Sequence, residues 1–241
     1  MITTGVDGPI GLIALDRHER RNALDVEHCR ELRAAVAELV DARSRVLVLT
    51  GEGSTFCAGA DLDGVHGADF RAELGAAVRA VLTAPVPVLA AVNGPAVGAG
   101  AQLALAADLR VAAPESFFAV PTARNGLAVD LWTVRRLEAL AGGGAARSLL
   151  LAGGRLDAAA AVRCGLVDRL GDREAALGWA REIAELAPLS LRYAKLALNA
   201  AETGEPETEL ERAYEACWSS EDAAEASRAR AERRAPAFRG R

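Results

Sequence analysis

Short apolar runs alternate with longer stretches of helical periodicity along most of the chain. Three runs, predicted to be buried strands, cover residues 10–15, 45–50 and 86–92. Between the first two, Leu32, Val36, Leu39 and Val40 recur at helical spacing, and Asp25 stands before them as a favoured N-cap. A second helix is predicted over residues 70–82, where prolines follow. Alternation of strands and helices predicts an α/β fold.

In the second half of the chain, the predicted pattern changes from alternating strands and helices to helices almost alone. Two strands are predicted at residues 108–113 and 116–120, around a Pro-Glu turn. From residue 173 onward the pattern is almost entirely helical, with helices predicted at residues 174–186, 189–201, 205–218 and 223–233. We therefore predict a core of residues 1–172 and a C-terminal helical subdomain of residues 173–241. Its apolar stripes exceed what solvated helices need, so the subdomain is expected to mediate oligomerisation.

Composition narrows the function classes. The 241 residues carry a net charge of −5 with both signs mixed, so no nucleic-acid-binding stripe is present in the sequence. No apolar run is long enough to cross a membrane and no signal peptide is recognisable, which predicts a cytoplasmic protein. The four cysteines are scattered without metal-ligand spacing, so we expect no metal site and reduced, buried thiols. Lys195 is the only lysine, so phosphate contacts would come mainly from arginines.

The stretch Asn93–Leu105, read N-G-P-A-V-G-A-G-A-Q-L-A-L, follows a buried apolar run directly. Glycine punctuation before small residues at helical spacing predicts a strand that turns sharply into a helix. The first amides of a helix lack intrahelical partners, so residues 97–100 could donate hydrogen bonds to an oxyanion. The alternative is a tightly packed strand-to-helix joint without a ligand.

A second stretch, S-T-F-C-A-G-A-D-L at residues 54–62, also follows a predicted strand and exposes backbone through small residues. Together with V-N-G-P-A-V-G-A-G about 40 residues later, it resembles the enoyl-CoA hydratase/isomerase (crotonase) superfamily. The resemblance covers essentially the whole chain. It implies a spiral of repeated ββα units, a coenzyme A thioester as ligand without another cofactor, and trimers that often pair into hexamers.

The resemblance also implies a set of site residues. Each of the two stretches would supply one N–H to the thioester oxygen, and counting along the motifs assigns these donors to Ala58 and Ala99. The loop R-R-N-A-L at residues 20–24 would lie against the CoA moiety, although a solvated charged loop is the alternative for its arginines. The residues expected to contact acyl-CoA are Ala23, Ala58, Gly59, Ala60, Asp61, Leu62 and Ala99.

The sequence departs from the family at the two catalytic positions. Hydratases of this family use a pair of glutamates, whose positions here are held by Gln102 and Thr122. Neither side chain is a competent base at neutral pH. Asp130 is the remaining nearby acid and could serve the reaction, but we favour the alternative that it caps the helix that follows. His18, His28 and His66 lie outside these segments, and only His66 is close to the expected acyl pocket.

Three functions follow from this pattern. The first is an enzyme in which an oxyanion hole polarises an acyl-CoA thioester and Asp130 or a bound water replaces the glutamates. The second is an acyl-CoA-binding protein of lipid metabolism with weak or no hydratase activity, similar to actinobacterial paralogues that lack the glutamate pair. A structural protein without a ligand is the third. We favour the second.

Overall fold

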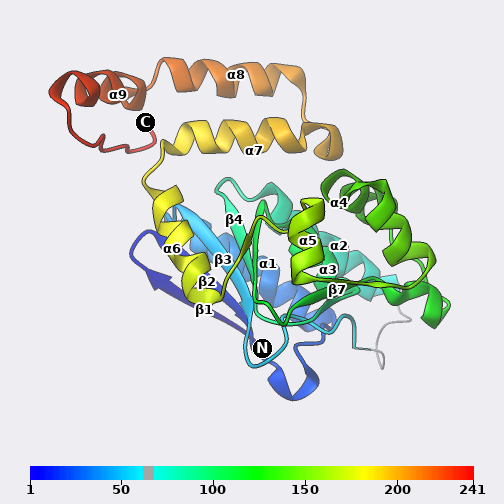
Figure 1. Ribbon diagram of the computed structural model, residues 1–241. Helices are drawn as coiled ribbons and strands as arrows, with labels where there is room; N and C mark the ends of the chain where they lie inside the picture. Colours follow the sequence, from blue (N-terminus) through cyan, green and yellow to red (C-terminus); the bar gives the residue numbers. More distant parts are fainter. Residues whose placement is uncertain (62–67) are drawn as a thin grey trace.

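The computed structural model describes residues 1–61 and 68–241 and is built on two β-sheets (Figure 1). The larger sheet has the strand order β1-β2-β3-β4-β6-β9, in which β1 is antiparallel to β2 and the other neighbours are parallel. Its strands are β1 (Ile2–Asp7), β2 (Ile10–Leu15), β3 (Val46–Gly51), β4 (Val88–Val92), β6 (Leu109–Ala112) and β9 (Arg169–Leu170). The smaller sheet contains β5 (Ala96–Val97), β7 (Phe117–Ala119) and β8 (Arg155–Asp157).

The central strands are apolar throughout because both faces of the larger sheet are covered. Successive side chains of a strand point to opposite faces. Val46 and Val48 of β3 accordingly pack in one hydrophobic cluster, whereas Leu47 and Leu49 pack in another. This two-sided burial explains why the sequence shows continuous apolar runs at β3 and β4 rather than alternation.

Helices on the two faces complete these clusters. On one side lie α1 (Val26–Asp41), α2 (Ala68–Thr83) and α3 (Ala99–Ala106), followed along the chain by α4 (Leu131–Leu151) and α5 (Ala158–Cys164). The other side is covered by α6 (Arg173–Ala184), through residues such as Ala180 and Ile183. The predicted boundary after residue 172 assigned α6 to the C-terminal subdomain, but α6 packs on the sheet and belongs to the core.

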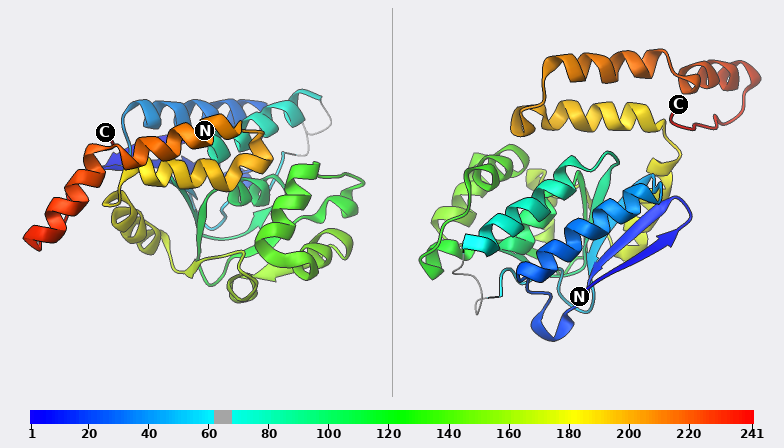
Figure 2. Two further views of the ribbon diagram at one scale, coloured as in Figure 1. Left: turned by 90° about the horizontal axis from the view of Figure 1, so that it is seen from above. Right: turned by 180° about the vertical axis from the view of Figure 1, so that it is seen from behind.

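The chain leaves the core after α6. The helices α7 (Pro188–Thr203), α8 (Glu207–Trp218) and α9 (Glu221–Glu232) form a layer that projects beyond the sheet, with the C-terminus folded back near the start of α7 (Figures 1 and 2). Lys195 anchors α7 to the core through Asp108, with 2.7 Å between the Lys195 Nζ and the Asp108 carboxylate. By contrast, α8 has no buried residue.

The predicted helices are confirmed within a few residues, but the strands show three differences. The Asn93–Leu105 segment does not turn straight into a helix, because β5 intervenes before α3. The strands β6 and β7 belong to different sheets and do not pair with each other. β1, β8 and β9 were not predicted, since their residues are mostly exposed and lack an apolar run. No helix in the described part of the chain is long and apolar enough to span a membrane.

Candidate functional site

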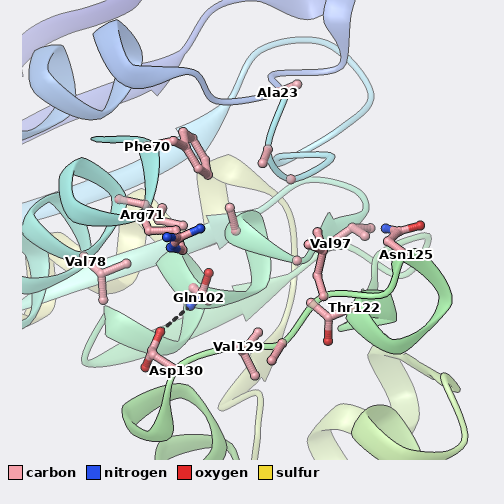
Figure 3. A pocket seen from close by; sticks show the side chains of 18 of the residues that line it. Ala23, Phe70, Arg71, Val78, Val97, Gln102, Thr122, Asn125, Val129 and Asp130 are labelled. Atoms are coloured by element: carbon pink, nitrogen blue, oxygen red, sulfur yellow. Dashed lines mark hydrogen bonds between the residues drawn. The ribbon is translucent and has the colours of Figure 1, made fainter. Parts of the chain in front are cut away.

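A pocket of about 750 Å³ opens between the loops that follow β3 and β4 and the helices α2, α3 and α4 (Figure 3). The predicted site residues Ala23, Ala58, Gly59, Ala60, Asp61, Ala99, Gln102, Thr122 and Asp130 all line it. Leu62 and His66 lie outside the described residues. Residues that are up to 107 positions apart in the sequence therefore meet at one cavity.

The two small-residue loops are held against each other by backbone pairing. The Cys57 N–H donates to the carbonyl of Pro95 (3.1 Å), and the Val97 N–H donates to the carbonyl of Cys57 (2.9 Å). At Gly100 a Cβ atom would lie 2.3 Å from the Cys57 carbonyl oxygen, so only glycine permits this contact. Gly59 also approaches the second loop closely, since a Cβ atom there would lie 2.9 Å from the Val97 carbonyl oxygen.

Backbone amides of both loops at this joint are left without partners in the described part of the chain, and those of Ala60 and Ala99 are among them. Ala99 is the first residue of α3, where an N–H has no intrahelical acceptor. Ala60 forms a parallel bridge with Leu24 in which Gly59 and Asp61 make the two hydrogen bonds (2.8 and 2.7 Å). The Ala60 N–H therefore points away from Leu24. Within residues 1–61 and 68–241, neither amide donates a hydrogen bond to the protein, and both residues line the pocket.

The predicted donor at Ala58 is wrong. Its N–H already donates to the carbonyl oxygen of Arg21 at 3.0 Å and is not available to a ligand. The contact arises because the polar loop after β2 folds over residues 57–61, with Arg21 and Asn22 in the left-handed backbone region. Ala60, two residues further along, has the free N–H instead.

The side chain of Asn22 holds this polar loop in place through hydrogen bonds, a role that the sequence analysis did not predict. The side chain is 1% exposed. Its Nδ2 donates to the carbonyls of Glu52 (2.9 Å) and Thr55 (2.7 Å), and its Oδ1 accepts from the Arg17 N–H (3.0 Å). A buried amide that satisfies a loop in this way is structural. An asparagine inside the motif R-R-N-A-L was the available signal, but its partners lie about 30 residues away.

Gln102 and Asp130 form one hydrogen-bonded unit with Thr133. The Gln102 Nε2 lies 2.9 Å from Asp130 Oδ2 and 2.7 Å from Thr133 Oγ1, and the Gln102 side chain is almost fully buried. Asp130 is the N-cap of α4 and accepts from the Thr133 N–H at 2.9 Å. The capping interpretation of Asp130 is thus confirmed. Its carboxylate reaches the pocket while bonded to Gln102 and Thr133.

Thr122 lies at the edge of the pocket in the short 3-10 helix Pro121–Asn125, and no described acidic side chain takes the place of a second glutamate beside it. Glu202 of α7 is a further acidic lining residue that the sequence did not indicate. It accepts from the Trp132 Nε1 (2.6 Å) and from Arg136 (3.2 Å). Both carboxylate oxygens are therefore occupied, and they connect α7 to the pocket wall.

Positive charge borders the pocket. Arg20, Arg71 and Arg79 line it, and none of them forms an ion pair with a described residue. Arg30 and Arg33 nearby are different, since both pair with Glu73. Asp61, predicted to contact the ligand, lies 2.9 Å from Arg17 Nη1 and ties the polar loop to the pocket rim. Unpaired guanidinium groups suit the binding of phosphate.

No cysteine or histidine within residues 1–61 and 68–241 lines the pocket. Burial raises the pKa of Cys57 to about 12, and burial together with Asp25 and Glu73 raises that of Cys29 to about 12. Both thiols are therefore protonated at neutral pH. The cysteines are all free, but Cys164 and Cys217 are only half-buried, contrary to prediction. His28 contacts the Asp25 cap of α1, and His18 is exposed. The described residues contain no cluster of metal-ligating side chains.

Comparison with known proteins agrees with the geometry. The model of the enoyl-CoA hydratase/isomerase family matches residues 6–241. A probable enoyl-CoA hydratase of Mycobacterium tuberculosis is 46% identical over 233 residues, 95% of each chain. The carnitinyl-CoA dehydratase of Citrobacter koseri is 35% identical and aligns with 97% of this chain and 96% of its own. The crystal structure of the enoyl-CoA hydratase of Bacillus anthracis superimposes with a TM-score of 0.90 at 30% identity, covering 100% and 99% of the two chains.

A mixed α/β core with paired small-residue loops around one cavity is the architecture of a crotonase fold, and the predicted fold class is confirmed. The chain belongs to the enoyl-CoA hydratase/isomerase family of the crotonase superfamily.

Proposed function

We propose that this protein binds acyl-CoA, with the thioester oxygen between the N–H groups of Ala60 and Ala99, and has weak or no hydratase activity. The observation that carries the proposal is the pair of unpartnered amides on adjoining loops of one pocket. Fixed amide donors aimed at a thioester oxygen stabilise negative charge on it. The family match and the names of the relatives support a CoA thioester of fatty acid metabolism as the ligand.

The rest of the pocket is consistent with such a ligand. Apolar residues of α2, including Phe70, Leu74 and Val78, form a wall suited to an acyl chain. Arg20, Arg71 and Arg79 border the same cavity and could neutralise the phosphates of CoA. No metal or cofactor beyond the CoA thioester is part of the proposal.

Hydration needs a positioned group that accepts and returns protons. Gln102 is an amide whose Nε2 is committed to Asp130 and Thr133, and Thr122 is an alcohol. An active enzyme that uses Asp130 or a bound water is the alternative. The hydrogen bonds that hold Asp130 as the N-cap of α4 and as the partner of Gln102 weigh against it as a base. We therefore retain binding as the main function.

Assembly and location are part of the same proposal. We propose a homotrimer or a dimer of trimers, with α7 to α9 as the oligomerisation subdomain, in the cytoplasm. Exposed aromatic and aliphatic side chains on α7 and α8 support a subunit contact there.

The test compares octanoyl-CoA with free CoA by isothermal titration calorimetry. Ala99→Pro deletes one donor at the first helical position, where proline is tolerated, and should weaken octanoyl-CoA binding about tenfold while leaving CoA binding unchanged. Ala99→Gly keeps the N–H and serves as the matched control. Equal losses for both ligands with Ala99→Pro would contradict the assignment. A spectrophotometric assay with crotonyl-CoA should show little or no turnover.

A further inference from the structure

The Gln102 side chain is a polar group on the pocket wall whose hydrogen atoms are all accounted for. It is 6% exposed, and its Nε2 donates to Asp130 Oδ2 (2.9 Å) and to Thr133 Oγ1 (2.7 Å). The Thr133 hydroxyl has one hydrogen, which it donates to Asp130 Oδ2 at 3.0 Å. Toward Gln102, Thr133 is therefore an acceptor, and so is the Asp130 carboxylate.

This arrangement determines which end of the Gln102 amide faces the ligand. A side-chain amide can be turned by 180°, and its hydrogen-bond partners decide the orientation. Two acceptors on one side require the nitrogen there, so the oxygen Oε1 is on the other side. Figure 3 shows the nitrogen turned toward Asp130 and the oxygen pointing away from it.

The Gln102 Oε1 atom is accessible to a ligand from the pocket, as its surroundings show. It accepts no hydrogen bond from the described part of the chain. Ser44 Oγ is the only fully buried side-chain polar atom in that part of the chain without a partner. Since Oε1 is also unpartnered and is not fully buried, the pocket that Gln102 lines gives access to it. An acceptor with no donor therefore faces the ligand.

Its position relative to Ala99 indicates which part of the ligand it meets. Gln102 lies three residues after Ala99 on α3, a rise of about 4.5 Å along the helix and nearly one full turn. With the thioester oxygen at the Ala99 amide, a group at that separation faces the carbons next to the thioester rather than the end of the acyl chain.

We propose that this pocket selects acyl thioesters that carry a hydrogen-bond donor, an O–H or N–H group, on carbon 2 or 3. Gln102 is the specificity-determining residue, and Asp130 and Thr133 are positioning residues that hold its oxygen toward the ligand. The inference rests on the proposed acyl-CoA binding. A saturated chain leaves Oε1 without a protein or ligand donor, and a 3-oxo group would place two acceptors face to face.

The test uses four ligands of equal chain length, octanoyl-CoA and its 2-hydroxy, 3-hydroxy and 3-oxo derivatives, titrated calorimetrically into the full-length protein. One of the hydroxylated thioesters should bind about tenfold more tightly than octanoyl-CoA, and the 3-oxo thioester should bind no more tightly than octanoyl-CoA. Gln102→Leu should abolish this preference, so that the hydroxylated thioesters and octanoyl-CoA bind this variant with equal affinity. Gln102→Met is the second variant if the leucine variant fails to fold.

The outcomes separate the two proposals. If octanoyl-CoA itself does not bind, the proposed function fails. If octanoyl-CoA binds but the hydroxylated thioesters bind no better, or if their advantage persists without Gln102, only the donor selectivity is overturned. Asp130→Asn tests the positioning role, because an asparagine can donate to Oε1 and let the Gln102 amide turn. That variant should narrow the difference between the hydroxy and 3-oxo thioesters, and an unchanged difference would remove Asp130 from the proposal.

Discussion

Glutamine at position 102 differs from the glutamate of the family's hydratases by one NH₂ group in place of a carboxylate oxygen, and this difference changes both the hydrogen bonding and the acid–base chemistry of the side chain. A glutamate there would meet the carboxylate of Asp130, whereas the Gln102 amide donates to it at 2.9 Å. The same amide cannot shuttle a proton. Gln102 and Asp130 thus form a compatible pair, and we expect that a glutamate at position 102 would require a change at Asp130 as well.

We predict that Gln102→Glu with Thr122→Glu alone restores hydration poorly. Two carboxylates within hydrogen-bond distance raise the pKa of one of them, so the new glutamate would be partly protonated. Adding Asp130→Asn removes the repulsion, and this triple variant should raise crotonyl-CoA turnover by on the order of a hundredfold. Steady-state rates of the natural protein and both variants provide the measurement. Fast turnover by the natural sequence would show that another group performs the chemistry.

At the scale of elements, Asp130 and Lys195 each hold a helix in place. Asp130 stabilises the start of α4, and Lys195 fastens α7 to the end of α2 and to the segment that precedes β4. The Lys195 Nζ donates to the carbonyls of Val81 (3.3 Å) and Val86 (3.0 Å) in addition to pairing with Asp108. Burial lowers the pKa of Lys195, whereas Asp108 opposes that shift.

For the cap, Asp130→Ala should lower the free energy of unfolding by about 1 kcal/mol, because the Thr133 N–H loses its acceptor. Asn is equally favoured as an N-cap, so Asp130→Asn should be nearly neutral. Urea denaturation followed by circular dichroism would measure both. A similar loss for the two variants would mean that the carboxylate charge matters more than the cap.

For the buried pair, Lys195→Met should destabilise the fold by roughly 3 kcal/mol, because Asp108 would keep a charge without its partner. The double variant Lys195→Met with Asp108→Asn should recover part of that loss, since no unpaired charge is left. Asp108 also accepts from the Val88 N–H at 2.8 Å, which the asparagine oxygen can still do. Additive losses in this double-mutant cycle would contradict an interaction between the two groups.

At the scale of the whole molecule, helices cover both faces of the larger sheet, whereas α7 and α8 carry large apolar side chains that are exposed. Leu198 is 81% exposed and Trp218 67% exposed. Tyr214 packs between Tyr193 and Trp218, with ring centroids 5.6 and 6.1 Å away. Large apolar side chains gathered on a layer that projects from the core are typical of a subunit interface.

We therefore predict that Trp218→Glu shifts the protein from a trimer or hexamer toward the monomer, because a charge would be buried in the contact. Size-exclusion chromatography with multi-angle light scattering measures the mass directly. Val6→Glu is the matched control, since Val6 is similarly exposed, at 62%, but lies on β1 of the core sheet. An unchanged mass for Trp218→Glu, or a natural protein that is monomeric, would contradict the proposed assembly.

The sequence by itself determined the family, the α/β class, the helices, the caps at Asp25 and Asp130, and the pocket residues that lie in or next to the two small-residue motifs. These properties depend on local periodicity, on capping geometry and on two motifs with characteristic spacing. Tertiary structure decided what depends on distant partners. The Ala58 N–H donates to the carbonyl of Arg21 and is not available to a ligand, whereas the Ala60 N–H is free. The Gln102 oxygen faces the pocket only because Asp130 and Thr133, about 30 residues away, hold its nitrogen. Glu202 of α7 lines the pocket, and α6 packs on the larger sheet. A hydrogen bond between segments depends on both partners at once, and neither segment's sequence contains the other.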